Sequence, residues 1–190
     1  MPDLAPLTPL GGTTPRRDRI GGVTIAEACD WALASVTARR GRASDAAGRM
    51  AAMIGTALPG PGAMVRSGDW RAVWLAPESW LLAAPLAGQD DIEARLRDAV
   101  GDAASVTEQT DAWARFDITA ANPARVGALL ERLCNIPPAR LTPGAATRTV
   151  FEHLGVIMLR ETDDSLSILG ARSSARSLHH ALTTVARSLA

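Results

Sequence analysis

The chain has 190 residues, of which 47% are hydrophobic and 21% charged, a balance typical of a folded globular protein and not of a disordered one. Its 20 basic and 20 acidic residues cancel, so no net charge attracts nucleic acid or an anionic membrane. All the basic residues are arginines, and the absence of lysine excludes any mechanism in this chain that needs a Schiff-base or phosphate-loop lysine.

The N-terminal residues 1–22 are rich in proline, glycine, threonine and arginine and show no hydrophobic period, so they predict an extended, mobile arm. The arm lacks the apolar core of an export signal, and no apolar stretch approaches the ~20 residues that cross a bilayer. Two distant cysteines, Cys29 and Cys134, are expected to be buried thiols. The expected location is therefore the reducing cytoplasm.

After this arm, strand and helix patterns alternate along the chain. Ser44 is placed to cap a first helix and Pro59 to end it. Asp90 and Asp91 suit the positive end of a second helix, which Gly101 is placed to end. The elements expected up to residue 110 are, in order, a strand at 31–40, a helix at 45–57, a loop at 58–69, strands at 70–76 and 80–84, a helix at 90–100 and a strand at 105–109.

Two tryptophans lie close together in a chain that has few aromatic residues. Trp74 and Trp80 flank a turn at Pro77–Ser79, and the two apolar runs that carry them predict a β-hairpin. At a period of two residues both indoles can enter the core, where each buries on the order of 200 Å². A ligand pocket is the alternative, but only Glu78 supplies a polar group nearby. We therefore interpret both tryptophans as core and packing residues.

The second half repeats this mixture of helices and strands. Residues 113–119 alternate so that Ala114, Phe116 and Ile118 share one face of a strand. Asn122–Pro123 combines a capping residue with a first-turn proline and is a strong helix start. The later elements expected are a loop at 135–144, strands near 147–152, 154–160 and 165–170, and a closing helix that begins at Ser173 or Ser174.

Helices mixed with antiparallel strands and hairpins predict an α+β fold. We expect two βαβ-type, ferredoxin-like halves, about residues 23–110 and 111–190, that together form a single domain after the arm.

The three histidines are the first candidates for chemistry. His179 and His180 are adjacent on the closing helix and so point about 100° apart. His180 falls on the side of Arg176 and Arg187, which indicates a solvated or interface position, whereas His179 flanks the apolar stripe. His153 lies between two strands. No GxSxG, HExxH or phosphate-cradle motif occurs. We therefore predict no catalytic, cofactor-binding or metal-binding residue in this chain.

Four stretches, taken in order, resemble one known family, the gamma subunit of heterotetrameric sarcosine oxidase. The first is similar to the family's "WLGPDEWLL" segment, and the others to its strand–helix unit, its proline–glycine turn with the following strands, and its closing arginine–serine segment. The resemblance covers the chain from about residue 31 to the end. The four stretches are WLAPESWLL (74–82), FDITAANPARVGALLERLCNI (116–136), LTPGAATRTVFEHLGVIMLR (141–160) and ILGARSSARSLHHAL (168–182).

The resemblance implies a non-catalytic structural subunit of a flavin-dependent complex that demethylates sarcosine to glycine, forming hydrogen peroxide and formaldehyde or methylene-tetrahydrofolate. It implies alpha, beta and delta partner subunits that hold FAD, FMN, NAD, tetrahydrofolate and zinc, with no cofactor in this chain. It also implies a fold similar to the folate-binding domain of the glycine-cleavage aminomethyltransferase. The positions expected to serve packing or an interface are Trp74, Trp80, Gly144, Arg172, Arg176 and Arg187.

That similarity of fold raises an alternative function, a folate-binding one-carbon transfer domain. Aminomethyltransferases carry a "GGIIDDL" segment whose acidic residues engage folate. The corresponding residues here read LGVIMLR, with Met158 and Leu159 in place of the two acids. A pterin would be left without its carboxylate partner, at a cost of ~1–3 kcal/mol or more. The sequence therefore favours the structural subunit over folate binding.

Overall fold

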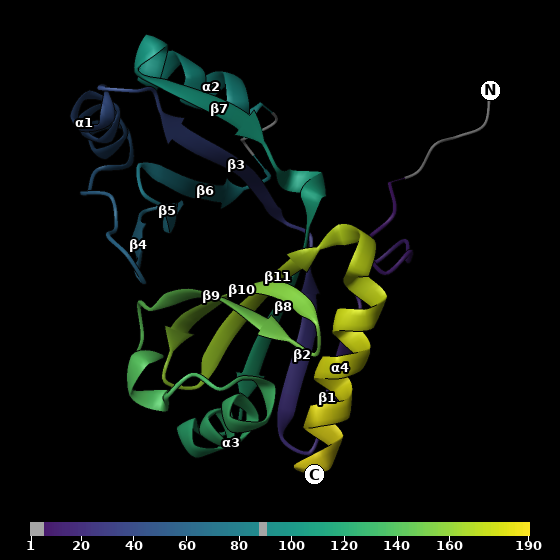
Figure 1. Cartoon of the computed structure of the whole chain (residues 1–190). Coiled ribbons are helices and arrows are strands. Elements are labelled where there is room, and N and C mark those ends of the chain that lie inside the picture. Colours follow the sequence, from purple (N-terminus) through teal and green to yellow (C-terminus); the bar gives the residue numbers. More distant parts are fainter. Residues whose placement is uncertain (1–5, 88–90) are drawn as a thin grey trace, which may run out of the picture. The chain divides into compact units, whose positions relative to one another are not determined.

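Within residues 6–87 and 91–190, which the computed structural model describes, the chain forms two antiparallel sheets and four α-helices (Figure 1). This confirms the predicted α+β class. The chain divides into two compact units, one of residues 30–110 and one that combines the N-terminal stretch up to Cys29 with residues 111–190. The described residues also contain four short 3₁₀ helices: η1 (Gly101–Ala103), η2 (Thr110–Ala112), η3 (Pro138–Arg140) and η4 (Arg172–Ser174).

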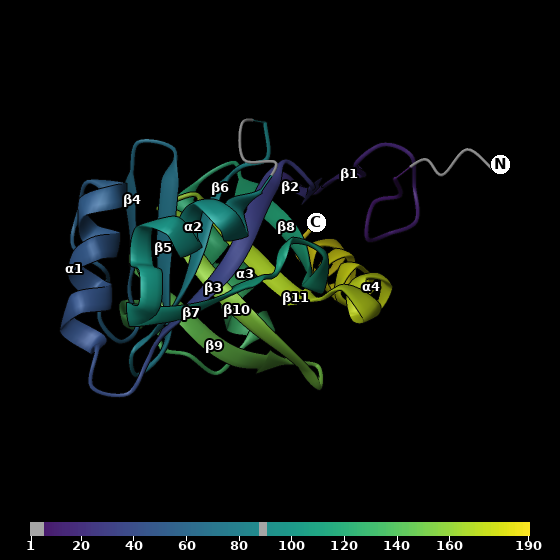
Figure 2. The same ribbon diagram turned by 90° about the horizontal axis from the view of Figure 1, so that it is seen from above.

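The unit of residues 30–110 is a five-stranded sheet with the order β4-β5-β6-β3-β7. Without the edge strand β4, this is the βαββαβ order of a ferredoxin-like fold. Helices α1 and α2 lie side by side (Figures 1 and 2), and their buried Met50 and Leu96 share a core with Leu82 of β6. The elements are β3 (Trp31–Ala38), α1 (Ala43–Ile54), β4 (Met64–Ser67), β5 (Trp70–Ala76), β6 (Ser79–Pro85), α2 (Ile92–Val100) and β7 (Ala104–Glu108).

The boundaries of α1 differ from those that the sequence predicted. The helix begins at Ala43, so Ser44 lies inside its first turn and does not cap it; the N-cap position is Arg42, which makes no side-chain capping bond. The helix ends at Gly55, whose left-handed conformation (φ 78°) stops the helix before Pro59 is reached.

Two further boundaries in this unit follow from hydrogen bonds. The carboxylate of Asp91 accepts a 2.8 Å hydrogen bond from the Ala94 amide and so caps α2, as its acidic start suggested. Asp90 lies outside the described residues. Strand β4 falls within the stretch 58–69 that was expected to be a loop, because Met64 and Val65 pair with β5 and extend the sheet by one strand.

The second unit is a six-stranded sheet with the order β1-β2-β8-β11-β10-β9. Alternate residues of β8, namely Ala114, Phe116 and Ile118, are fully buried under helices α3 and α4, as the alternation predicted. Asn122 caps α3 by accepting a hydrogen bond from the Arg125 amide, at 3.0 Å. The elements are β1 (Arg17–Ile20), β2 (Val23–Ala28), β8 (Trp113–Ala120), α3 (Pro123–Leu133), β9 (Ala146–Phe151), β10 (Leu154–Thr162), β11 (Ser165–Ala171) and α4 (Ala175–Ser188).

Strands β1 and β2 correct the expected arm and the expected start of the first half. Residues 17–20, assigned to the mobile arm, pair with β2 through a turn at Gly21 and Gly22, whose φ angles of 51° and 79° suit a two-residue hairpin. Strand β2, assigned to the first half, instead pairs with β8 because its buried Val23 and Ile25 complete the second core. The two sheets therefore share a four-strand arrangement, β5-β6-β3-β7 in one unit and β10-β11-β8-β2 in the other. Strand β2 lies beside β8 just as β7 lies beside β3.

Candidate interaction site

The two tryptophans of the β5–β6 hairpin lie directly opposite each other but in different environments. Trp80 is only 8% exposed and belongs to the core of its unit. Its indole Nε1 donates a 3.0 Å hydrogen bond to the carbonyl oxygen of Pro59. Trp74 is half-buried and packs against the edge of the same core. The one polar group of the Trp80 side chain, its indole N–H, is thus bonded to the main chain.

Gly144 supplies a turn that only glycine adopts without strain. Its φ is 87°, and the amide of Ala145 donates to the carbonyl of Thr142 across the turn, at 2.9 Å. The Gly144 amide also donates to the carbonyl of Arg160, at 2.9 Å, which ties this turn to β10. These contacts give Gly144 a role in shaping the loop before β9.

The structure places the three arginines near α4 in different surroundings. One Nη atom of Arg172 donates a 2.7 Å hydrogen bond to the carbonyl of Leu7, and the other lies 3.2 Å from Asp111 Oδ1. Arg187 is exposed near the end of the helix. It lies about 16 Å from Arg176 along the helix axis, since an α-helix rises 1.5 Å per residue. Arg176 lines a hollow of about 460 Å³ together with Glu152, Leu154, Ser177 and His180.

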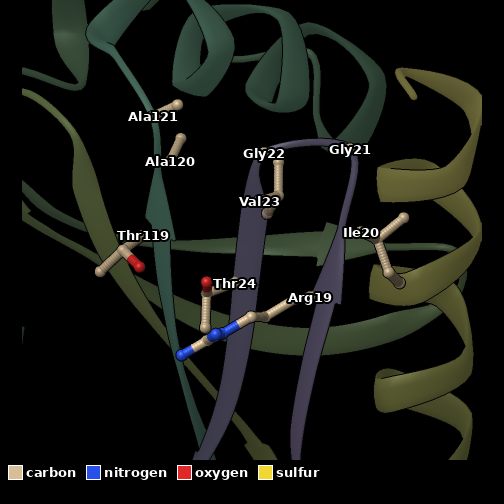
Figure 3. Close-up of a pocket in the computed structure, with 9 residues that line it drawn as sticks. All are labelled: Arg19, Ile20, Gly21, Gly22, Val23, Thr24, Thr119, Ala120 and Ala121. Atoms are coloured by element: carbon tan, nitrogen blue, oxygen red, sulfur yellow. The ribbon is translucent and has the colours of Figure 1, made fainter.

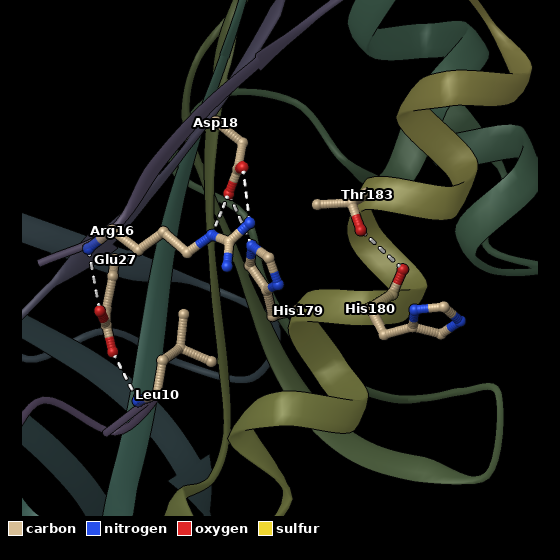
Figure 4. Close-up of polar contacts among 7 residues, drawn as sticks. All are labelled: Leu10, Arg16, Asp18, Glu27, His179, His180 and Thr183. Atoms are coloured by element: carbon tan, nitrogen blue, oxygen red, sulfur yellow. Dashed lines mark hydrogen bonds and ion pairs between the residues drawn. The ribbon is translucent and has the colours of Figure 1, made fainter. Parts of the chain in front are cut away.

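Glu27 fastens the N-terminal segment to the six-stranded sheet (Figure 4). Its carboxylate is 5% exposed, and its two oxygens accept hydrogen bonds from the amides of Leu10 and Arg16, at 2.9 and 3.0 Å. The amide of Glu27 donates in turn to the carbonyl of Arg16, at 2.8 Å. Leu10 packs against the core of this unit. Together with the hydrogen bond from Arg172 to the Leu7 carbonyl, these contacts bind the expected arm to the fold at several points from Leu7 onward.

Asp18 joins β1 to α4 through two partners (Figure 4). The Arg16 guanidinium donates from Nε and Nη2 to the two oxygens of this carboxylate, and His179 Nε2 lies 2.7 Å from its Oδ2. The hydrogen bond from Arg16 lowers the pKa of Asp18, and His179 adds to this effect. The His179 ring also contacts Phe116, with 5.8 Å between centroids.

His180 points away from this cluster and is exposed, so the two histidines diverge as their helical spacing predicted (Figure 4). Its carbonyl accepts a 2.9 Å hydrogen bond from the Thr183 hydroxyl. The structure therefore does not bring His179 and His180 together as an acid–base pair.

A hollow of about 440 Å³ lies over the β1–β2 hairpin and the end of β8 (Figure 3). The polar side chains that line it are the Arg19 guanidinium and the hydroxyls of Thr24 and Thr119, which lie on one face of the sheet. Its other lining residues are Ile20, Gly21, Gly22, Val23, Ala120 and Ala121. Its lining therefore carries hydrogen-bond donors and one positive charge without a carboxylate.

Sequence reasoning missed the structural contacts of Glu27 and Asp18 and the position of Arg19 at the edge of a hollow. The available signal was the pair Gly21–Gly22, which is typical of the turn of a tight hairpin and is followed by the alternating residues 23–26. The contact between Asp18 and His179 joins residues 161 positions apart and has no local signature.

Among the described residues, no group of three or more histidine, cysteine, aspartate or glutamate side chains is placed to bind a metal ion. Neither Cys29 nor Cys134 forms a disulfide, and each is partly exposed, whereas the sequence predicted buried thiols. No helix in the described part of the chain has the length and apolar character needed to span a membrane.

Comparison with known proteins gives one family and two informative structures. The sequence matches the family described as "Sarcosine oxidase, gamma subunit family" over residues 40–186. A chain of the heterotetrameric sarcosine oxidase from Corynebacterium sp. U-96, in complex with pyrrole 2-carboxylate, has a TM-score of 0.74 at 23% identity, over 90% of this chain and 87% of that chain.

The second structure is the glycine cleavage system aminomethyltransferase T from Bartonella henselae. It has a TM-score of 0.60 at 14% identity, over 85% of this chain but only 45% of that chain. At these identities both structures establish a shared fold, as the sequence resemblance predicted. No functionally curated protein matches the sequence.

Proposed function

The chain belongs to the sarcosine oxidase gamma subunit family, and from this premise we propose that it is a non-catalytic assembly subunit of a heterotetrameric sarcosine oxidase. The observation that carries the proposal is the family match over residues 40–186, which includes elements of both compact units. In this proposal the partners are the alpha, beta and delta subunits of the complex.

The proposed complex oxidises sarcosine to glycine, with reduction of oxygen to hydrogen peroxide and release of the methyl carbon as formaldehyde or methylene-tetrahydrofolate. FAD, FMN, NAD, tetrahydrofolate and zinc would then be held by the partner subunits. The polar clusters of this chain support a structural role, because they join segments of its own backbone. Glu27 binds two main-chain amides, and Asp18 joins a strand to a helix.

The alternative, a folate-binding one-carbon transfer domain, has the aminomethyltransferase fold in its favour. The residues do not fit tetrahydrofolate, however. Met158, which replaces the first of the two folate-binding acids, is 2% exposed and belongs to the apolar core between the sheet and its helices. A thioether in an apolar core offers neither charge nor a strong acceptor to a pterin. We therefore derive no step through folate in this chain.

Co-expression with the candidate partner subunits tests the proposal. The tagged chain should co-purify with flavin-bearing subunits in a fixed stoichiometry by native mass spectrometry, and the complex should form hydrogen peroxide when sarcosine is added. Omitting this chain should lower the yield or thermal stability of the complex. The proposal would be wrong if the chain purified alone while the other subunits assembled with full yield and activity.

Calorimetry separates the two candidate functions. The purified full-length chain should show no saturable binding of tetrahydrofolate. Binding at micromolar affinity or tighter would favour the one-carbon transfer domain instead.

A further inference from the structure

The hollow over β1, β2 and β8 presents three donors in one row (Figure 3). Arg19 pairs with Thr24 in the register of β1 and β2, and Thr24 pairs with Thr119 in the register of β2 and β8. Paired positions on neighbouring strands are about 4.8 Å apart, so the guanidinium and two hydroxyls occupy adjacent places on one face. This row matches a group that accepts several hydrogen bonds and carries negative charge.

The hairpin that carries this row is held in place on two sides. Gly21 lies so close to the chain terminus that a Cβ on it would come within 2.6 Å of Ala190. The carbonyl of Gly22 accepts a 2.9 Å hydrogen bond from the Ala121 amide. Because the backbone is fixed around it, the hollow exists before any ligand arrives, and binding costs little backbone conformational entropy.

Arg19 differs from Arg16 in how its charge is used. Arg16 is paired with Asp18, whereas the Arg19 guanidinium has no hydrogen-bond or ion-pair partner within the described residues. A structural explanation exists, since charged residues on an edge strand such as β1 discourage pairing with other chains. That explanation applies equally to Arg17, which lies two residues away on the same face but does not line the hollow. The two arginines therefore provide a matched comparison.

We propose that this hollow receives the carboxylate of an aspartate or glutamate side chain from a partner subunit. The inference rests on the proposed function. Arg19 would bind the carboxylate with its paired N–H groups, and Thr24 or Thr119 would donate a further hydrogen bond. A free carboxylate would bind weakly here, because an exposed ion pair is screened by water and salt. A partner that covers the hollow removes this screening and strengthens the same contact.

The absence of lysine makes a direct test possible. Arg19→Lys introduces the chain's first side-chain amine, which a carbodiimide condenses with a touching carboxylate to form an amide with loss of water. In the assembled complex, Arg19→Lys should give a cross-link to another subunit, and mass spectrometry should identify the acidic residue. Arg17→Lys is the control and should give no cross-link through residue 17; cross-links that the wild-type complex also forms, between partner lysines and carboxylates of this chain, are subtracted. Assembly of Arg19→Lys with no intersubunit cross-link, or with as much as Arg17→Lys gives, would overturn the proposal.

A binding measurement provides the second readout. Arg19→Gln should raise the dissociation constant for assembly about tenfold, which corresponds to ~1.4 kcal/mol, and Arg17→Gln less than twofold. Neither change should alter thermal unfolding of the isolated chain. Equal effects of the two variants, or saturable binding of acetate by the isolated chain at low millimolar concentration, would contradict a partner carboxylate. If the wild-type chain never co-assembles, the proposed function is wrong as well. If the wild type assembles and only the predicted effects of Arg19 fail, the proposed function stands and the carboxylate site alone is wrong.

Discussion

Replacing Trp80 by alanine should destabilise the chain far more than the same change at Trp74. Trp80 is 8% exposed, and the loss of a buried tryptophan side chain costs ~3–5 kcal/mol. The change also removes the hydrogen bond from its indole to the buried Pro59 carbonyl, which adds ~1 kcal/mol. Trp74 occupies the paired position on the neighbouring strand but is only half-buried, so Trp74→Ala should cost about half as much.

Urea unfolding followed by circular dichroism measures both variants against the wild type. Trp80→Phe adds a test of the hydrogen bond, because phenylalanine keeps most of the apolar contact and lacks the indole donor. Trp80 is not a core residue if Trp80→Ala costs less than about 1.5 kcal/mol, or no more than Trp74→Ala. A folded Trp80→Ala variant that assembles normally but changes the affinity of the complex for its substrate would identify a binding site instead of a core.

Gly144→Ala should cost ~1–2 kcal/mol in thermal or urea unfolding because φ is 87°, whereas Gly155→Ala, in open space with ordinary backbone angles, should be neutral. Asp18 has a lowered pKa, so its stabilising contribution is present above its unfolded pKa of about 3.9 and is lost as the pH falls through the lower folded value. Asp18→Asn should therefore flatten acid unfolding in that range. Glu27→Gln turns an amide group toward main-chain N–H groups, and it should cost ~1–3 kcal/mol and speed proteolysis of the N-terminal segment.

Where the sequence predicted an element correctly, the relevant forces were local. The strand at β8 shows in the alternation of Ala114, Phe116 and Ile118, because these apolar residues share one fully buried face while the positions between them are polar. The start of α3 shows in Asn122, whose side chain bonds an amide only three residues away. Such features depend on neighbouring residues and can be recognised without knowledge of the fold.

Where the prediction was wrong, the partner was distant in the chain. Strand β1 is an edge strand that contains Arg17, Asp18 and Arg19 in succession, so its sequence shows no apolar alternation although its burial alternates. It is a strand because β2 pairs with it, and β2 is in this sheet because of β8, almost a hundred residues later. The hollow at Arg19 depends on the same long-range pairing. A sequence-based argument could not have placed Thr24 beside Thr119.

This topology also predicts the order in which the chain folds. The unit of residues 30–110 is continuous, whereas the other unit joins β2 to β8 across that whole segment. Closing a longer loop costs more entropy before its contacts form, so the pairing of β5 with β6 should precede that of β2 with β8. In pulse-labelled hydrogen exchange during refolding, amides of β6 should therefore gain protection before those of β2. If β2 were protected first or at the same time, the two-segment origin of this unit would not control the order of its folding.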